Sequence, residues 1–206
     1  MKRETKKYKA ISLGNGEWFI RLKPGNELLE ALSEFAQLTK KKFITIISGV
    51  GGGFEDVWGY FSQSEKKHGV KSVAKKLPKK MYELTAIGGN ITWIKDNSGK
   101  LKPFVHAHAN FSDDEFKTHG FHLTKAYSSK EKGLTGEITV KVSDVEVKRV
   151  NEEESGLPLN FVSNESSIKN NSNKREMPWE IVIPLVLIIG ILLITVIFLF
   201  TRNNKK

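Results

Sequence analysis

The segment from residue 17 to residue 53, "EWFIRLKPGNELLEALSEFAQLTKKKFITIISGVGGG", contains the elements that decide the fold. Its first part is rich in aromatic and β-branched residues and stops at Pro-Gly, which predicts a strand followed by a turn. Asn26 is then expected to cap a helix over residues 26–42, with acids in its first turn and lysines in its last. Apolar residues recur there at helical spacing: Leu28, Leu29, Leu32, Phe35 and Ala36. "FITIISGVGGG" follows as a strand that runs into glycines.

The chain beyond this segment is dominated by predicted strands. "FEDVWGYF" at 54–61 predicts a short strand, and "MYELTAIGGNITWIK" at 81–95 predicts two strands around its paired glycines. "FVHAHANF" at 104–111 alternates as a strand, and residues 136–150 predict a long strand or a strand pair. Residues 66–80 have little apolar periodicity and are expected to form a loop or an irregular edge. One helix among many strands predicts an α+β fold, as a single compact, mainly antiparallel β-sheet domain over residues 1–150.

The C-terminal part of the chain has a different composition. Residues 151–178 are rich in Asn, Ser and Glu and predict a flexible polar linker. Residues 181–200, "IVIPLVLIIGILLITVIFLF", contain no charge, and a helix of this length spans roughly 30 Å, the thickness of a bilayer core. With Trp179 as an interfacial anchor, we expect a transmembrane helix over residues 179–201 and a basic tail over residues 202–206.

The N-terminus is basic, but no apolar run follows it, so no signal peptide is expected. We therefore expect a single-pass, tail-anchored protein of the cell membrane whose N-terminal domain lies in the cytoplasm. Residues 1–150 hold 27 Lys and Arg against 17 Asp and Glu, whereas residues 151–206 balance. The basic excess could face nucleic acid or an anionic membrane surface, or it could reflect base composition alone. The chain has no Cys, which excludes disulfides, thiolate metal sites and Cys nucleophiles.

One glycine-rich motif and one acidic motif do not indicate a catalytic site. The glycines of "SGVGGGFED" at 48–56 lack the following Gly-Lys-Ser/Thr of a phosphate loop, so a tight turn or bulge between strands is expected. Asp113, Asp114 and Glu115 are expected to be solvated in a hairpin turn.

The histidines carry more information, because four of the chain's five lie within "HAHANFSDDEFKTHGFHL" at 106–123. His106 and His108 are two residues apart, so on a strand both point to the same face. Two such imidazoles and a third from another element can bind zinc with one coordination position left open. The spacing leaves His119 and His122 as candidates for the third ligand, and it also leaves hydrogen-bonded structural histidines as the alternative.

Four blocks of the sequence together resemble the plants and prokaryotes conserved (PPC) domain family. They are the strand–helix–strand segment with the "VWGYF" that follows it, "YELTAIGGNI", and the histidine segment, and the resemblance covers roughly residues 8–150. The family pattern has His-x-His, an acidic hairpin and then Gly-Gly-His-Leu. His106, His108 and His122 match it, Phe121 replaces the second glycine, and His119 is not a family position.

The resemblance implies an α+β domain that assembles as a homotrimer, with a metal on His106, His108 and His122 near a subunit boundary. It places Glu83 as a possible acid, base or structural carboxylate, and it matches Arg21 to a family arginine. Met81 stands where another arginine is usual. Plant members add Arg-Gly-Arg-Pro segments that enter the DNA minor groove, and this sequence contains no such segment.

Three functions remain open at this point. The first is a non-enzymatic, membrane-tethered trimer that contacts DNA backbone or another anionic partner through basic residues of 66–80, namely Lys66, Lys67, Lys71, Lys75, Lys76, Lys79 and Lys80. The second is a zinc-dependent enzyme on the three histidines, with Glu83 as acid or base. The third is a structural or ligand-sensing trimer. The balance favours a binding protein over an enzyme.

Overall fold

The computed structural model describes residues 1–65, 69–131, 135–151 and 158–162. Before the helix come β1 (Lys2–Glu4), β2 (Tyr8–Gly14) and β3 (Glu17–Leu22), and the helix α1 covers Leu28–Thr39. The strands after it are β4 (Phe43–Glu65), β5 (Gly69–Lys76), β6 (Tyr82–Lys95), β7 (Leu101–Ser112), β8 (Thr118–Ser128), β9 (Gly136–Ser143), β10 (Val147–Asn151) and β11 (Pro158–Val162). The described part is therefore mainly β with one helix, as predicted for the fold class.

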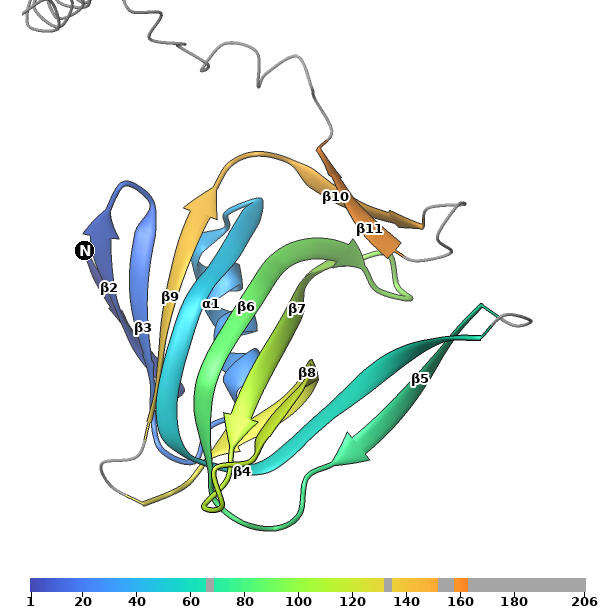
Figure 1. Ribbon diagram of the computed structural model, residues 1–206. Helices are drawn as coiled ribbons and strands as arrows, with labels where there is room; N and C mark the ends of the chain where they lie inside the picture. The colour runs from blue at the N-terminus through green and yellow to red at the C-terminus, as the bar shows by residue number, and fades with distance from the viewer. Residues whose placement is uncertain (66–68, 132–134, 152–157, 163–206) are drawn as a thin grey trace, which may run out of the picture. The chain divides into compact units, whose positions relative to one another are not determined.

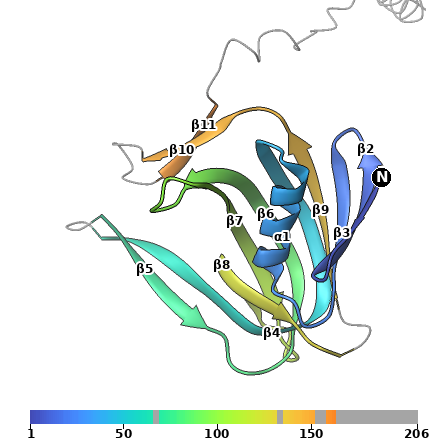
Figure 2. The ribbon, with the colours of Figure 1, turned by 180° about the vertical axis from the view of Figure 1, so that it is seen from behind.

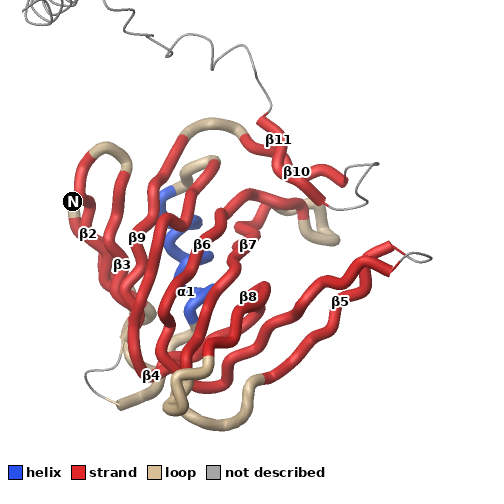
Figure 3. Tube along the Cα trace, viewed as in Figure 1, coloured by secondary structure: helices blue, strands red, loops and turns tan. Residues whose placement is uncertain are grey.

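The long strand β4 organises the sheet (Figures 1 and 3). Its first half pairs with β9 on one side and β6 on the other, and its second half pairs with β8 and β5. All of these pairings are antiparallel. Because β8 also pairs with β7, the strand series β4-β6-β7-β8 returns to β4, and the sheet closes on itself. Beyond β8, the end of β4 and β5 extend as a two-stranded arm.

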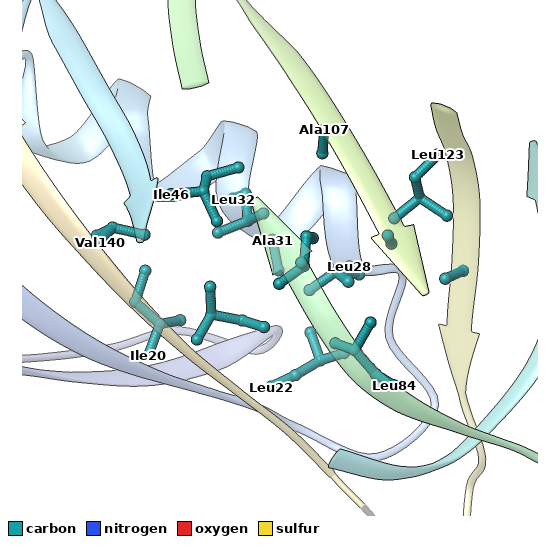
Figure 4. Packing of buried hydrophobic residues seen from close by; sticks show 14 of the residues in the cluster. Ile20, Leu22, Leu28, Ala31, Leu32, Ile46, Leu84, Ala107, Leu123 and Val140 are labelled. Atoms are coloured by element: carbon teal, nitrogen blue, oxygen red, sulfur yellow. The ribbon is translucent and has the colours of Figure 1, made fainter. Parts of the chain in front are cut away.

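The helix α1 lies against one face of this curved sheet (Figure 2). Leu28, Ala31 and Leu32 of the helix face inward, and Figure 4 shows them among Ile46, Ala107 and Leu123 of the strands. All of these side chains are buried. Burial of such a stripe stabilises the domain by about 25 cal/mol for each Å² of apolar surface removed from water. The predicted helical spacing is confirmed, with Ala31 as an additional buried position and Leu29 only partly buried.

The start of the helix differs from the prediction. Glu27, not Asn26, is the N-cap, and one carboxylate oxygen accepts a hydrogen bond from the Glu30 N–H at 2.6 Å. The other oxygen accepts from the Ala126 N–H of β8 at 2.9 Å. A carboxylate has two oxygens and satisfies both donors at once, whereas the Asn26 side chain donates to the carbonyls of the preceding turn. The last turn carries no basic residue, since Lys40 follows the helix in the left-handed conformation.

The glycines near residue 50 do not separate two strands. Residues 43–65 form one continuous strand, and the register of its pairing with β6 shifts between Gly51 and Phe54, so the predicted bulge lies inside the strand. At Gly51 the backbone φ is 157°, and a side-chain carbon there would overlap the carbonyl oxygen of Thr135. The glycine is required because β4 passes very close to the backbone that leads into β9.

Three further segments differ from the predictions. Residues 82–95 form the single strand β6 rather than two strands, because the paired glycines stay in register with β7. Part of the basic segment, for which a loop or an irregular edge was predicted, forms the regular edge strand β5, since β4 supplies a hydrogen-bonding partner. Residues 158–162, inside the predicted linker, form β11 and pair with β10. One compact unit of the structure spans Met1–Ser163.

The predicted transmembrane helix at 179–201, the basic tail and most of the linker lie outside the described residues. Within the described ranges, no helix has the length and apolarity needed to cross a bilayer.

Candidate metal centre

Two adjacent strands bring three histidines together. His106 and His108 lie on the same face of β7, while Ala107 and Ala109 between and after them are buried on the helix side. His122 of β8 lies directly opposite His108 in the antiparallel register. Side chains of directly opposed residues are neighbours on a sheet, so the pairing places the third imidazole beside the first two. The predicted two-residue alternation is thus confirmed, and the structure selects His122.

The three imidazoles form a tight cluster. Their ring centroids are separated by 5.3 Å for His106–His108, 4.7 Å for His106–His122 and 4.8 Å for His108–His122. One ring nitrogen from each residue lies within 4.8 Å of the other two. Among the described residues, this is the only group of three or more metal-ligating side chains at such spacing.

Burial and charge keep two of these histidines neutral. Burial lowers the pKa of His106 to about 4, and electrostatic repulsion from Arg149 and from the neighbouring His108 acts in the same direction. The pKa of His122 is also lowered to about 4, chiefly by burial and then by the neighbouring histidines and Arg149. Neutral imidazole is the form that binds a metal ion. Both ligands are therefore in the binding form at neutral pH.

Residues from other elements surround the cluster. The ring of Tyr60, from β4, stacks on His122 at a centroid distance of 4.2 Å and an interplanar angle of 22°. Arg149, from β10, places Nη1 3.5 Å from His106 Nδ1. A cavity of about 460 Å³ opens beside the cluster, and its lining includes Tyr60, Phe61, Gly88, His108, Asn110 and His122. The imidazoles of His108 and His122 therefore face a space large enough for a small ligand.

The donor set fits zinc. Three imidazoles with an open position match the ligand number of a catalytic or ligand-binding zinc site, and zinc accepts nitrogen ligands at about 2.0–2.1 Å. Phe121 does not crowd the imidazoles, because its ring stacks on Phe111 and lies over Gly59.

The other residues singled out in the sequence lie away from the three histidines. Glu83 is exposed on β6 and pairs with Ser112, four residues along β7 from His108, which corresponds to about 13 Å of strand. It does not reach the cluster within one chain. Arg21 pairs with Glu137 of β9 at 2.8 Å. His119 hydrogen-bonds Asp113 at 3.2 Å and is not part of the cluster.

Asp113 is not solvated, contrary to the prediction, because the β7–β8 turn folds around it. Its side chain is 4% exposed and accepts hydrogen bonds from the Glu115 and Lys117 N–H groups. Burial alone would raise its pKa, but hydrogen bonds from His119, the Lys117 N–H and Lys80 outweigh this effect and hold the pKa well below the usual value. The other two acids of the turn, Asp114 and Glu115, are exposed as predicted.

Only part of the predicted basic surface can be described. Lys66 and Lys67 lie outside the described residues, and Lys71 is placed only by its backbone in β5, opposite Gln63. Lys76 contacts Asp56 at 2.5 Å and lies over the Trp58 ring. Lys80 contacts Asp113 at 3.1 Å and Asp114 at 2.7 Å. Lys75 and Lys79 are exposed.

Sequence reasoning missed Tyr60 and Arg149. Neither residue has a local signal, because each comes from a strand that is distant in sequence from the histidines. Tyr60 belongs to "VWGYF", a block that contributed to the family resemblance, and this block was the one available hint. Arg149 lies at the end of the region interpreted as a strand pair and had no identifiable role.

A family model of the Plants and Prokaryotes Conserved domain, abbreviated PCC or PPC, matches residues 13–141, which is more than half of the chain. A comparison with curated proteins finds no match.

Several solved structures share the fold. A "putative DNA-binding protein" from Ralstonia eutropha has 23% identity and a TM-score of 0.58, covering 76% of this chain and 96% of its own. A PPC protein from Pyrococcus horikoshii has 22% identity and a TM-score of 0.55, covering 79% and 99%. A metal-containing protein from Archaeoglobus fulgidus has 22% identity and a TM-score of 0.55, covering 77% and 99%. At these identities the likeness concerns the fold. With the family model spanning most of the described domain, the chain belongs to the plants and prokaryotes conserved (PPC) domain family.

Proposed function

We propose that this chain is a membrane-tethered, trimeric PPC-domain binding protein that holds a zinc ion and captures a small ligand beside it. The observation that carries the proposal is the convergence of His106, His108 and His122 from two paired strands at the edge of a cavity. The metal-containing relative from Archaeoglobus fulgidus supports the choice of a metal.

The residues favour binding over catalysis. A bound zinc ion acts as a Lewis acid and offers its open position to a ligand. His106, His108 and His122 would hold it, and Tyr60 packs flat against His122 and limits the movement of that ring. Among the described residues, no carboxylate joins the cluster, and Glu83 lies too far along the strand to serve as its acid or base. A general acid or base must lie within hydrogen-bond reach of the proton that it transfers.

Metal analysis of the full chain, purified in detergent without chelators, tests the zinc proposal. We expect about one zinc per chain in the wild type and in His119→Gln, because His119 lies on β8 with His122 but outside the cluster. His108→Ala should lose the metal. Absence of metal from the wild type after zinc exposure and desalting, or equal zinc content in His108→Ala, would refute the proposal.

A second candidate function is contact with DNA backbone. The description of the Ralstonia eutropha structure favours it, as does the exposure of Lys75 and Lys79. Lys76 and Lys80 already have acidic partners, which argues against a large contribution of residues 66–80 to DNA binding. Lysines that neutralise phosphates release counterions, so the binding should weaken steeply with salt.

Electrophoretic retardation of duplex DNA by the full chain in detergent tests this candidate. At about 50 mM salt we expect retardation that the double substitution Lys75→Gln/Lys79→Gln weakens. The double substitution Lys40→Gln/Lys41→Gln, directly after helix α1, removes the same charge and should have less effect. No retardation by the wild type at low salt would exclude DNA as the partner.

The trimer is proposed from the family resemblance and from exposed apolar side chains on the β4–β5 arm. Phe61 and Val73 are directly paired there and are 62% and 46% exposed. Exposed apolar patches on a protruding element are typical of interaction surfaces. A trimer would have a protein mass of about 70 kDa, three times 23.2 kDa. Mass determination by light scattering in detergent should give this value, and Phe61→Asp should lower it; a wild-type monomer would overturn the proposal.

The membrane tether is proposed from the uncharged run at 181–200 alone. Protease treatment of sealed cells should leave the N-terminal domain intact, because we place it in the cytoplasm. Cleavage from outside would reverse the orientation, and recovery of the full chain in the soluble fraction would remove the tether.

A further inference from the structure

We propose that Arg149 makes the histidine centre a receptor for a small oxyanion, a carboxylate or phosphate group, and that the β10–β11 hairpin is the element that adds this selectivity. The inference deepens the proposed function and rests on its zinc centre. It concerns the class of ligand, which the family match and the comparisons do not specify.

The hairpin holds Arg149 firmly beside the cluster. Its guanidinium carbon lies 5.0 Å from the centroid of the Phe104 ring, in a cation–π arrangement. Its Nη1 lies 3.5 Å from Oδ1 of Asn160, the residue directly opposite it in β11. Asn160 in turn donates from Nδ2 to Asn90 Oδ1 at 3.1 Å, which ties β11 to β6. Asn90 is the strand partner of His106. The arginine is therefore positioned by both strands of the hairpin.

No anionic side chain contacts Arg149 among the residues that the structure describes. Among the described residues its partners are His106, Asn160 and the Phe104 ring, and none of these is an anion. A guanidinium in such a position stays charged and gains most from an anionic partner.

A metal ion held by the three histidines would strengthen the need of Arg149 for an anionic partner. Nη1 of Arg149 lies 3.5 Å from a nitrogen of His106, so a divalent cation held by the histidines would add repulsion to the same small volume. An oxyanion that reaches both positive charges removes this repulsion. Carboxylate and phosphate groups match the planar fork of a guanidinium and are also oxygen donors for zinc. The arginine and the open metal position therefore select the same class of ligand.

The hairpin lies outside the residues that the family model matches. The match ends at residue 141, whereas Arg149 lies in β10 and Asn160 in β11. The three histidines fall inside the match. The cavity of about 460 Å³ beside His108 and His122 has room for the rest of a small molecule that carries the oxyanion.

Coupling between zinc and anion binding tests the inference. The full chain in detergent, stripped of metal, is titrated with zinc against a competing chromophoric chelator in nitrate buffer, alone, with acetate, or with inorganic phosphate. Because linked binding is reciprocal and typically amounts to 5–150-fold, we expect at least one of the two anions to tighten zinc binding by about 10-fold. A larger effect of acetate indicates a carboxylate ligand, and a larger effect of phosphate indicates a phosphate ligand.

Two variants separate the role of Arg149 from a general charge effect. In Arg149→Gln, zinc should bind without anion at least as tightly as in the wild type, and the anion effect should fall below about 2-fold. Lys148→Gln removes the same charge from the adjacent position of β10 and should retain the wild-type coupling.

Two results would overturn the inference. Either the wild type binds zinc and neither anion changes its affinity, or Arg149→Gln keeps the full anion effect. A wild type that binds no zinc under any of these conditions is a different result, since it removes the proposed zinc centre and the oxyanion inference with it.

Discussion

The two faces of β7 and β8 are built from alternating residues of the same strands, yet they differ in almost every property. On one face Ala107, Ala109 and Phe111 are at most 3% exposed, and Figure 4 shows Ala107 on the side of the helix. On the other face His106, His108 and His122 gather beside a cavity and beside Tyr60 and Arg149. Successive strand residues point to opposite sides, so one pair of strands supplies both the core and the site.

This arrangement separates stability from binding. The apolar face stabilises the fold through burial, while the histidine face presents imidazole nitrogens that can hold a metal ion. A rigid sheet beneath the histidines also holds them in place better than a loop would. Substitutions on one face should therefore change stability, and substitutions on the other should change binding.

The largest effect is expected from Phe111→Ala on the core face. Phe111 is fully buried and contacts Phe54 edge-on and Phe121 face-on. Loss of a buried aromatic ring should lower the free energy of unfolding by about 3–5 kcal/mol. Urea denaturation followed by fluorescence measures this change. The folded fraction should still bind zinc, and loss of zinc by a fully folded variant would contradict the separation of the two faces.

His108→Ala should show the opposite behaviour. His108 is exposed, so its removal should change the free energy of unfolding of the metal-free protein by less than about 0.5 kcal/mol. Zinc affinity should fall by about 100-fold or more, because one of three metal ligands is lost. Chelator competition and urea denaturation of the same sample measure both quantities. A large loss of stability without metal would indicate that the histidine is structural.

Tyr60→Leu should have a smaller effect on binding. The ring stacks on His122 as a directly opposed cross-strand pair, an interaction worth about 0.5–1 kcal/mol. Losing this support should weaken zinc binding by about 2–5-fold, through a less ordered His122. Tyr60→Phe keeps the ring and serves as the matched control. Equal losses in both variants would indicate that the hydroxyl, and not the stacking, matters.

The smallest effect on zinc binding is expected at the turn that joins the two strands, where a substitution should change stability instead. The folded pKa of Asp113 is held below its unfolded value, so its ionised form contributes stability above about pH 4 that is lost as the pH falls through the folded pKa. Asp113→Asn should therefore lie closer to the wild type in acid than at pH 7. Unfolding free energies from pH 7 down to pH 3 measure the difference. A constant difference over this range would mean that the carboxylate charge makes no contribution.

Local spacing alone predicted several features correctly. The repeat of apolar residues at 28, 32, 35 and 36 predicts the helix and its buried face, because helical periodicity depends only on near neighbours. The two-residue separation of His106 and His108 places them on one strand face for the same reason. The family resemblance, and not the spacing, singled out His122 over His119.

Contacts between distant segments decided the rest. Glu27 caps the helix because a strand almost a hundred residues later presents Ala126 N–H to the same carboxylate. The glycines at 51–53 lie within one strand because β6, β8 and β9 supply partners along its length. Arg149 reaches His106 because β10 and β11 pair and fold back over the end of the sheet, where Asn160 meets Asn90.

The sequence by itself therefore determined the helix, about half of the strands and the shared face of the first two histidines. Only the tertiary structure decided the strand register that places His122 beside the other two histidines and the distance of Glu83 from them. It also decided that Tyr60 and Arg149 lie next to the histidines. The physical reason is that side-chain direction along one element follows from residue spacing, whereas the neighbours of that side chain depend on hydrogen-bonded pairing between segments far apart in the chain.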